Sequence, residues 1–219
     1  MGPDDARTAP STIRLKRASE APQANDGVRV LVDRLWARGI SKDAAGLDAW
    51  MKELGPTDDL RTWFGHQPGR WDEFAEKYRH ELETPLCQLL LTELQGVAKV
   101  STLTLVYGAH DTKENEAVVL RDYLLHETAQ PNARWDAPTK LLLSVAVVAA
   151  AHHDAVAPVS GLKLFASPVL TAQELDASLK ELLTGGQLRE SSDGWEVTAR
   201  GQQRLRQVSS GESGEKASP

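Results

Sequence analysis

Three short segments of the chain concentrate side chains that can bind an anion, move a proton or stack on a ring. The first is VDRLWARG, residues 32–39, which includes the end of an apolar stretch. Arg34 and Arg38 could present paired N–H donors to a phosphate or carboxylate, with Trp36 beside them as a further ligand-binding residue. Asp33 could orient an arginine or act as a catalytic base. The alternative is a structural Asp–Arg pair that ties a loop down.

The second segment, TWFGHQPGRW at residues 62–71, places aromatic rings beside a histidine and an arginine. Trp63 and Phe64 could stack on a base or line a pocket. His66 could act as a catalytic acid or base. Arg70 could bind an anion at the start of the following helix. The alternative places the aromatic rings in the core and makes His66 a capping residue.

The third segment, YGAHDTKEN at residues 107–115, leaves a predicted strand and enters a predicted helix. Asp111 is a candidate catalytic carboxylate, and Asn115 is a candidate ligand-binding residue. Free backbone amides at such a helix start can hold an anion. The alternative is that Asp111 or Thr112 only caps the helix.

The elements that must position these segments alternate between strand and helix. Apolar and β-branched patterns predict strands, and helical spacing of apolar residues predicts helices. The predicted strands are 12–17, 28–32 and 101–107, and the predicted helices are 46–54, 70–83, 86–94 and 113–127. Strands separated by helices indicate crossover connections. We therefore expect an α/β domain with a mostly parallel sheet.

The position of the segments in this sheet predicts a common site. Ligands of α/β sheets bind beyond the carboxyl ends of the strands. The segments at 32–39 and 107–115 directly follow predicted strands. We therefore expect five residues to converge on one pocket at that edge: Asp33, Arg34, Arg38, His66 and Asp111. Such a pocket would hold an anionic or nucleotide-like small molecule, and the residues do not settle whether it is an enzyme's.

The second part of the chain predicts a different architecture. A small-residue helix over 139–153 is followed by a loop with Pro158 and Gly161. A second helix with a leucine stripe ends at Gly185-Gly186, and a hairpin over 187–201 turns at Asp193-Gly194. A short helix, 201–207, closes the part. Helices followed by a small hairpin indicate a winged-helix-like module.

The module leaves three roles open. Its only basic stripe is Arg189, Arg200, Arg204 and Arg206. Residues 136–207 hold seven Lys or Arg and eight Asp or Glu, and the candidate recognition helix is acidic, which is unfavourable for contacting DNA phosphates. We therefore retain three alternatives for the second part. It is a DNA-binding regulator that responds to a ligand, a protein-docking module, or a homodimer contact formed through the apolar run 141–151.

Composition places the chain among soluble proteins of a reducing compartment. The 219 residues carry a net charge of −6 and one cysteine, Cys87, which cannot by itself form an internal disulfide or a zinc site. The apolar run 141–151 is about half of a membrane span. We expect a cytoplasmic protein without a membrane segment or metal site. The chain contains no GxxxxGK[ST], GxGxxG or GxSxG motif, so no cofactor is assigned.

We expect five regions along the chain. They are a disordered lead at 1–11, an α/β domain at 12–127, a linker at 128–134, the winged-helix-like module at 135–207 and a disordered tail at 208–219.

The three segments, in this order, resemble a known family. DGVRVLVDRLWARGISK, WMKELGPTDDLRTWFGHQPGRW and LVYGAHDTKENEAVVL are similar to the YeaO-like members of the domain-of-unknown-function 488 family. The resemblance covers about 13–127 and implies a compact α/β fold of Rossmann-like character, with no established activity. Its motif positions here are Asp33, Arg34, Trp36, Arg38, Gly39, Trp63, Phe64, Gly65, His66, Arg70, Trp71, Asp111 and Asn115.

The chain departs from the family pattern at three positions. The family usually has proline, aspartate and histidine where this chain has Ala37, Gln67 and Glu114. The loss of a histidine at position 114 weakens any mechanism that needs two histidines. The residues from 128 onward lie outside the resemblance.

Overall fold

The computed structural model describes residues 12–129, 135–152 and 155–209. The elements before residue 130 are β1 (Ile13–Arg17), β2 (Val28–Leu31), α1 (Lys42–Ala45), β3 (Ala49–Trp50), η1 (Lys52–Leu54), α2 (Asp58–Phe64), η2 (Pro68–Arg70), α3 (Trp71–Leu82), α4 (Pro85–Val100), β4 (Leu103–Tyr107) and α5 (Glu116–His126). The later elements are α6 (Ala137–Ala151), β5 (Val156–Pro158), α7 (Val159–Ala166), α8 (Ala172–Thr184), β6 (Leu188–Ser191), β7 (Gly194–Val197) and α9 (Ala199–Ser209). The predicted lead, residues 130–134 of the predicted linker, and the tail from residue 210 lie outside the described residues.

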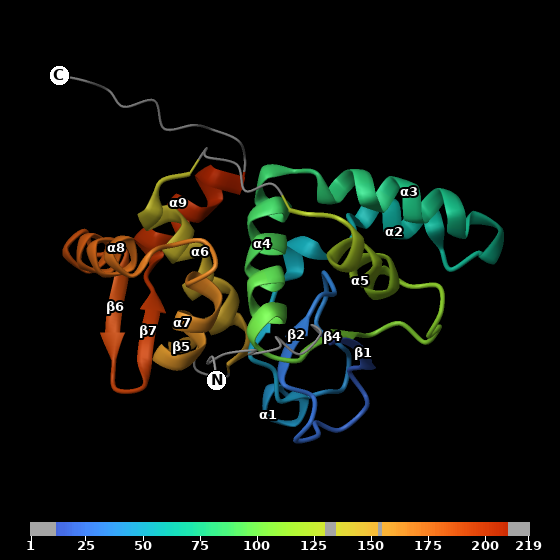
Figure 1. Cartoon of the computed structure of the whole chain (residues 1–219), viewed down its shortest axis with the longest axis horizontal. Helices are drawn as coiled ribbons and strands as arrows, with labels where there is room; N and C mark the ends of the chain where they lie inside the picture. The colour runs from blue at the N-terminus through green and yellow to red at the C-terminus, as the bar shows by residue number, and fades with distance from the viewer. Residues whose placement is uncertain (1–11, 130–134, 153–154, 210–219) are drawn as a thin grey trace, which may run out of the picture.

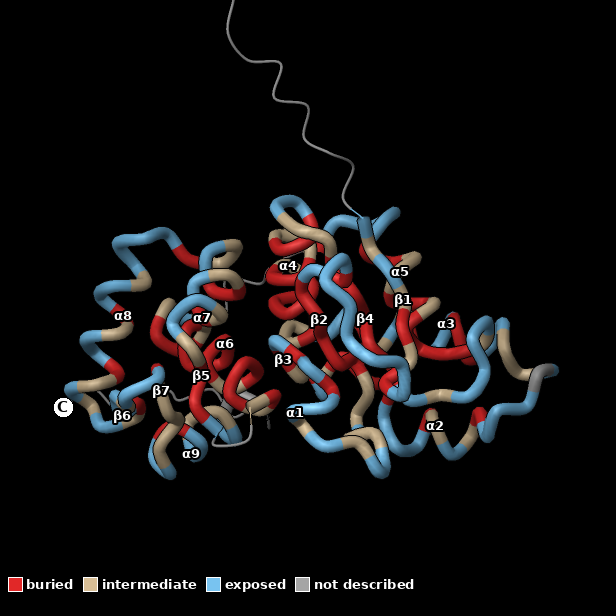
Figure 2. Tube along the Cα trace, turned by 90° about the horizontal axis from the view of Figure 1, so that it is seen from below, coloured by how far each residue is buried: buried red, intermediate tan, exposed pale blue. Residues whose placement is uncertain are grey.

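The first part is built on a four-stranded sheet whose strands all run parallel, in the order β1-β4-β2-β3. The central strands β2 and β4 are buried along their whole length, as Figure 2 shows in red. Their side chains are apolar apart from Arg29, Thr104 and Tyr107, which is the pattern of strands covered on both faces. The prediction of an α/β domain with a mostly parallel sheet is confirmed at this level.

The helix predicted over 46–54 is wrong. Residues 49–50 form the edge strand β3, and only Lys52–Leu54 turn, as a 3₁₀ helix. The backbone N–H of Asp48 donates to the carbonyl of Arg29, and the Asp48 carboxylate accepts from the N–H of Arg29 in return. Pairing with β2 therefore outweighs the local helical preference of this segment.

Helix α2 occupies a segment that we had expected only as a cluster of functional residues. The Thr57 hydroxyl caps its first turn, and Gly65 ends it in the left-handed conformation. The predicted helix that follows is confirmed as α3, with Phe74, Tyr78 and Leu82 buried on its inner face. The Tyr78 hydroxyl donates to the carbonyl of Leu54, which fixes α3 against the turn after β3.

The second part is a helical unit with a small antiparallel sheet, in the order β5-β7-β6. The loop predicted around Pro158 and Gly161 is instead strand β5 followed by helix α7. The predicted hairpin is present, but Ser191 pairs with Gly194, so the turn residues are Ser192 and Asp193. None of the helices in the described ranges combines the length and the apolarity needed to span a bilayer.

Both parts share one hydrophobic core. Helix α6 packs against β3, and α7 packs against α4, which stands between the two parts in Figure 1. The side chains of Leu141, Leu142, Val145 and Val148 on α6 are fully buried, so the apolar run 141–151, one candidate for a dimer contact, packs within its own chain. The Ser144 hydroxyl on α6 donates to Glu93 on α4 over 2.7 Å.

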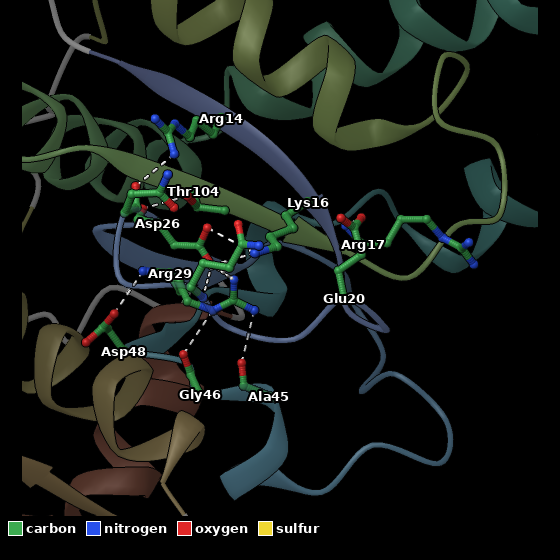
Figure 3. A network of polar contacts seen from close by, with 12 residues as sticks. Arg14, Lys16, Arg17, Glu20, Asp26, Arg29, Ala45, Gly46, Asp48 and Thr104 are labelled. Atoms are coloured by element: carbon green, nitrogen blue, oxygen red, sulfur yellow. Dashed lines mark hydrogen bonds and ion pairs between the residues drawn. The ribbon is translucent and has the colours of Figure 1, made fainter.

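A buried ionic network ties the loop before β2 to the sheet (Figure 3). Lys16 donates to both carboxylate oxygens of Asp26, and Arg29 donates to one of them. Arg29 also donates to the carbonyls of Ala45 and Gly46, which anchors α1. Burial would raise the pKa of Asp26, but donors from Lys16, the Gln23 backbone and Arg29 outweigh it and lower that pKa. This ionic network therefore has a structural role, since it holds the loop before β2 and helix α1 against the sheet.

Candidate functional site

A cavity of about 730 Å³ opens at the carboxyl ends of β2 and β4. Ligand pockets commonly have volumes of about 300–1,000 Å³. Its wall is formed by the loop after β2, the loop after β4, helix α2 and the first residue of α5. The lining residues that can carry charge are Asp33, Arg38, Asp58, Arg61, His66, His110 and Glu116. Its aromatic lining comes from Trp36, Phe64 and Phe74.

Asp33 is held in the cavity by the loop after β4. Its Oδ2 accepts the backbone N–H of Gly108 over 2.7 Å. A side chain at position 108 would put its Cβ within 2.8 Å of the same oxygen, so the Asp33 carboxylate would have to shift. Burial raises the pKa of the Asp33 carboxyl, and the Gly108 N–H with the nearby Arg61 and His66 only partly offsets that rise.

Glu116 lies at the start of α5, directly after the cap Asn115. Its side chain is buried, and its Oε1 has no hydrogen-bond partner among the described residues. Burial, followed by the negative charge of Asp33, raises the pKa of Glu116 to about 8. The group is therefore mostly protonated at neutral pH.

Cationic and imidazole groups lie on other parts of the wall. Arg38 is exposed and makes no ion pair with the described residues, whereas Arg61 pairs with Asp58 over 2.9 Å. His66 has a φ of 53°, a conformation that a side chain other than glycine adopts only under strain. Its ring lies 5.4 Å from that of Phe64. Nδ1 of His110 accepts a hydrogen bond from the Arg17 guanidinium over 3.0 Å.

Several predicted site residues have other contacts. Arg34 donates to the carbonyls of Pro56 and Gly55, each over 2.8 Å, and so ties two loops together. The guanidinium of Arg70, the last residue of η2, lies 5.3 Å from the ring centre of Trp63 and also donates to the Trp63 carbonyl. These three residues are not part of the cavity wall.

The predicted cap of α5 needs correction. Asn115 is the cap: its Oδ1 accepts the N–H of Val118, and its amide donates to the carbonyl of Asp111. The Asp111 carboxylate accepts the N–H groups of Glu114 and Lys113, which lower its pKa. Asp111 is exposed and is not part of the cavity wall. Its carboxylate therefore stabilises the turn before α5 and does not face the cavity.

The cavity residues that were not singled out from the sequence include Asp58, Arg61, Gly108, His110 and Glu116. Arg61 could have been found, because Thr57 and Gly65 are standard signals for the ends of the helix that carries it. Gly108 and His110 belong to a segment that we did select. Glu116 carried no sequence signal, since a glutamate in the first turn of a helix is ordinarily an exposed residue.

Two of the four arginines predicted to bind nucleic acid have intramolecular partners, and the other two are exposed. Arg189 pairs with Glu196 across the hairpin, and Arg204 donates to Asp136, Thr139 and Gln187. Arg200 and Arg206 are exposed on α9. Within the described part of the chain, no group of three or more His, Cys, Asp or Glu side chains is placed to hold a metal ion.

Comparison with known proteins places the first part in a family. The model of the inactive DUF488-N3 subclade matches residues 12–140. An uncharacterized protein of Mycobacterium tuberculosis is 38% identical over 112 residues, which are 51% of this chain and 92% of the relative. The uncharacterized protein YeaO of Escherichia coli is 39% identical over 117 residues, 51% of this chain and 96% of the relative. No solved structure matches the chain. The chain therefore belongs to the DUF488 family, in its inactive N3 subclade.

Proposed function

We propose that the cavity at the carboxyl edge of the sheet binds a small anionic molecule and that binding, rather than turnover, is its role. One observation carries the proposal: Glu116, whose buried Oε1 has no hydrogen-bond partner, and Arg38, whose guanidinium has no ion-pair partner among the described residues, line the same cavity. A buried polar atom without a hydrogen bond costs on the order of 1–3 kcal/mol. A ligand that bonded to it would recover that cost.

The charge of the wall favours an anion at the mouth. Arg38 is free to approach a ligand, and His66 lies on the same wall in a strained backbone conformation. Strain of this kind is concentrated at binding sites, where the fold holds a side chain in a defined place. The exposed Leu35 borders the same opening and offers apolar contact.

Binding without reaction is favoured by the state of the candidate catalytic groups. Asp111 uses its carboxylate in a turn, which leaves Asp33 and His66 as the remaining candidates in the cavity. The matching subclade is described as inactive. Glu114 stands where the family usually has a histidine, and of the two histidines on the cavity wall, His66 and His110, the second is already hydrogen-bonded to Arg17.

Calorimetric titration of the whole chain with ribose 5-phosphate tests the proposal. We expect saturable binding that Arg38→Gln weakens about 10- to 100-fold, the effect of losing one charge-assisted hydrogen bond. Arg200→Gln, which removes an exposed arginine from α9, is the matched control and should leave the affinity unchanged. Absence of binding, or equal losses in both variants, would refute an anion site at this cavity.

We also infer that residues 135–207 form a winged-helix-like module and that the first part has a Rossmann-like fold. The order α6-β5-α7-α8-β6-β7, with a sheet ordered β5-β7-β6, supports the first inference. Arg189 and Arg204 already have intramolecular partners. We therefore favour a protein-docking module over DNA binding. We also infer a reducing cytoplasmic location, in which the buried Cys87 stays a free thiol.

A further inference from the structure

The floor of the cavity presents two carboxyl groups, and the one that carries charge, Asp33, offers only acceptors, which an anion cannot satisfy. Oδ2 of Asp33 already accepts the Gly108 N–H, and its Oδ1 makes no hydrogen bond with the described residues. Oε1 of Glu116 is also unpartnered. Because the charge of Asp33 repels a phosphate or carboxylate, the part of the ligand that reaches this floor must carry N–H donors instead.

The mouth of the cavity has the opposite chemistry. Arg38 is exposed and unpaired there among the described residues, and His66 lies on the same wall. A guanidinium binds phosphate oxygens through two parallel N–H bonds. A single ligand that satisfies both ends therefore carries an anionic group at one end and adjacent N–H donors at the other.

The aromatic part of the cavity wall is rigid. Phe64 and Phe74 are nearly fully buried and stack on each other with ring centres 4.3 Å apart. Trp36 is fixed by a 2.7 Å bond from its Nε1 to the carbonyl of Ile40 and by edge contact with Trp50. Rigid aromatic side chains suit a flat ring system, which can contact them with little loss of conformational freedom.

We infer that the ligand is a nucleoside monophosphate whose base carries adjacent N–H donors, with the base edge at Asp33 and Glu116 and the phosphate at Arg38. Guanine fits this description, since its N1–H and its exocyclic amine are neighbouring donors. The cavity of about 730 Å³ has room for one such molecule. The inference rests on the proposed anion site and adds the class of molecule.

Paired titrations of the whole chain with guanosine monophosphate and ribose 5-phosphate test it. We expect the nucleotide to bind at least tenfold more tightly, because only the nucleotide reaches the floor. Asp33→Asn keeps an acceptor for the Gly108 N–H but turns an amide donor toward the base. It should weaken the nucleotide about tenfold and leave ribose 5-phosphate unchanged or slightly tighter, since a repelling charge is removed. Asp193→Asn, at the exposed hairpin turn, is the matched control.

The outcomes separate the two proposals. If ribose 5-phosphate binds as tightly as the nucleotide, or if Asp33→Asn leaves nucleotide binding unchanged, the floor does not recognise a base and the nucleotide class is wrong, while the anion site stands. If neither compound binds, the anion site fails and the nucleotide class fails with it. Tight nucleotide binding that is lost selectively in Asp33→Asn supports both.

Discussion

The stability of the fold should depend on one carboxyl buried between the two parts of the chain. Glu93 on α4 is 0% exposed, and its Oε1 accepts the Ser144 hydroxyl of α6 over 2.7 Å. Its Oε2 has no partner among the described residues. Burial raises the pKa of Glu93 from 4.5 to about 8, and the hydrogen bond from Ser144 offsets this only in part. The folded state therefore holds Glu93 protonated at neutral pH.

The sign and size of the effect follow from proton linkage. Between pH 4.5 and about 8 the unfolded chain has lost this proton and the folded chain keeps it, so folding becomes less favourable as the pH rises. Each pH unit in this window costs about 1.4 kcal/mol. Across the whole window the loss from this group is on the order of 4–5 kcal/mol. The contribution is complete below pH 4.5 and is lost by the time the pH passes 8.

Urea denaturation at a series of pH values from 5 to 8.5 measures this loss. Glu93→Gln has no ionisable group at this position and should make the decline in the free energy of unfolding shallower, leaving the part due to Glu116, whose pKa is also raised to about 8. Glu93→Met gives an independent check, because Ser144 can still donate to the carbonyl of Lys140. If either variant declines with pH as steeply as the natural protein, Glu93 is not the group responsible and the reasoning fails.

Two further variants test contacts inside each part. Asp26→Asn should lower the free energy of unfolding by about 3–5 kcal/mol, because it leaves Lys16 and Arg29 buried without their carboxylate. The control, Asp43→Asn on the surface of α1, should change it by less than about 0.5 kcal/mol. Arg204→Gln should lower the free energy of unfolding by about 1–2 kcal/mol, because its hydrogen bonds to Asp136 and Thr139 are lost. Arg206→Gln, at an exposed position of the same helix, should be nearly neutral. Equal effects of these two variants would contradict a structural role for Arg204.

Elements with strong local patterns were predictable from the sequence. The apolar run at β2 and the helical spacing of Phe74, Tyr78 and Leu82 each identify one conformation on their own. Strand β3 could not be found in this way. Its two residues become a strand only because Asp48 pairs with Arg29 of β2, a partner nineteen positions earlier. Local preference in that segment favours a helix.

The sequence predicts those site residues whose positions depend only on where a strand ends. Asp33 follows β2 and lines the cavity as the topology suggests. Arg34 and Arg38 have the same side chain, and the sequence offers no means of separating them. The close approach of Gly55, where a Cβ would lie 2.3 Å from the Arg34 nitrogen, places the Arg34 guanidinium within reach of the Gly55 and Pro56 carbonyls. Arg38 has no such neighbour and remains at the cavity.

The second part of the chain also supports the candidate site. The match to the subclade ends at residue 140, yet Ala151 at the end of α6 belongs to the buried cluster against which Trp36 packs. Lys42 donates to the carbonyl of His152 over 2.7 Å and lies 5.9 Å from the centre of the Trp36 ring. Any displacement of the loop that carries Asp33 and Arg38 must therefore be accommodated by the end of α6. The residues beyond the family match thus form the outer support of a loop inside it, so the two parts act as one structural unit at this cavity.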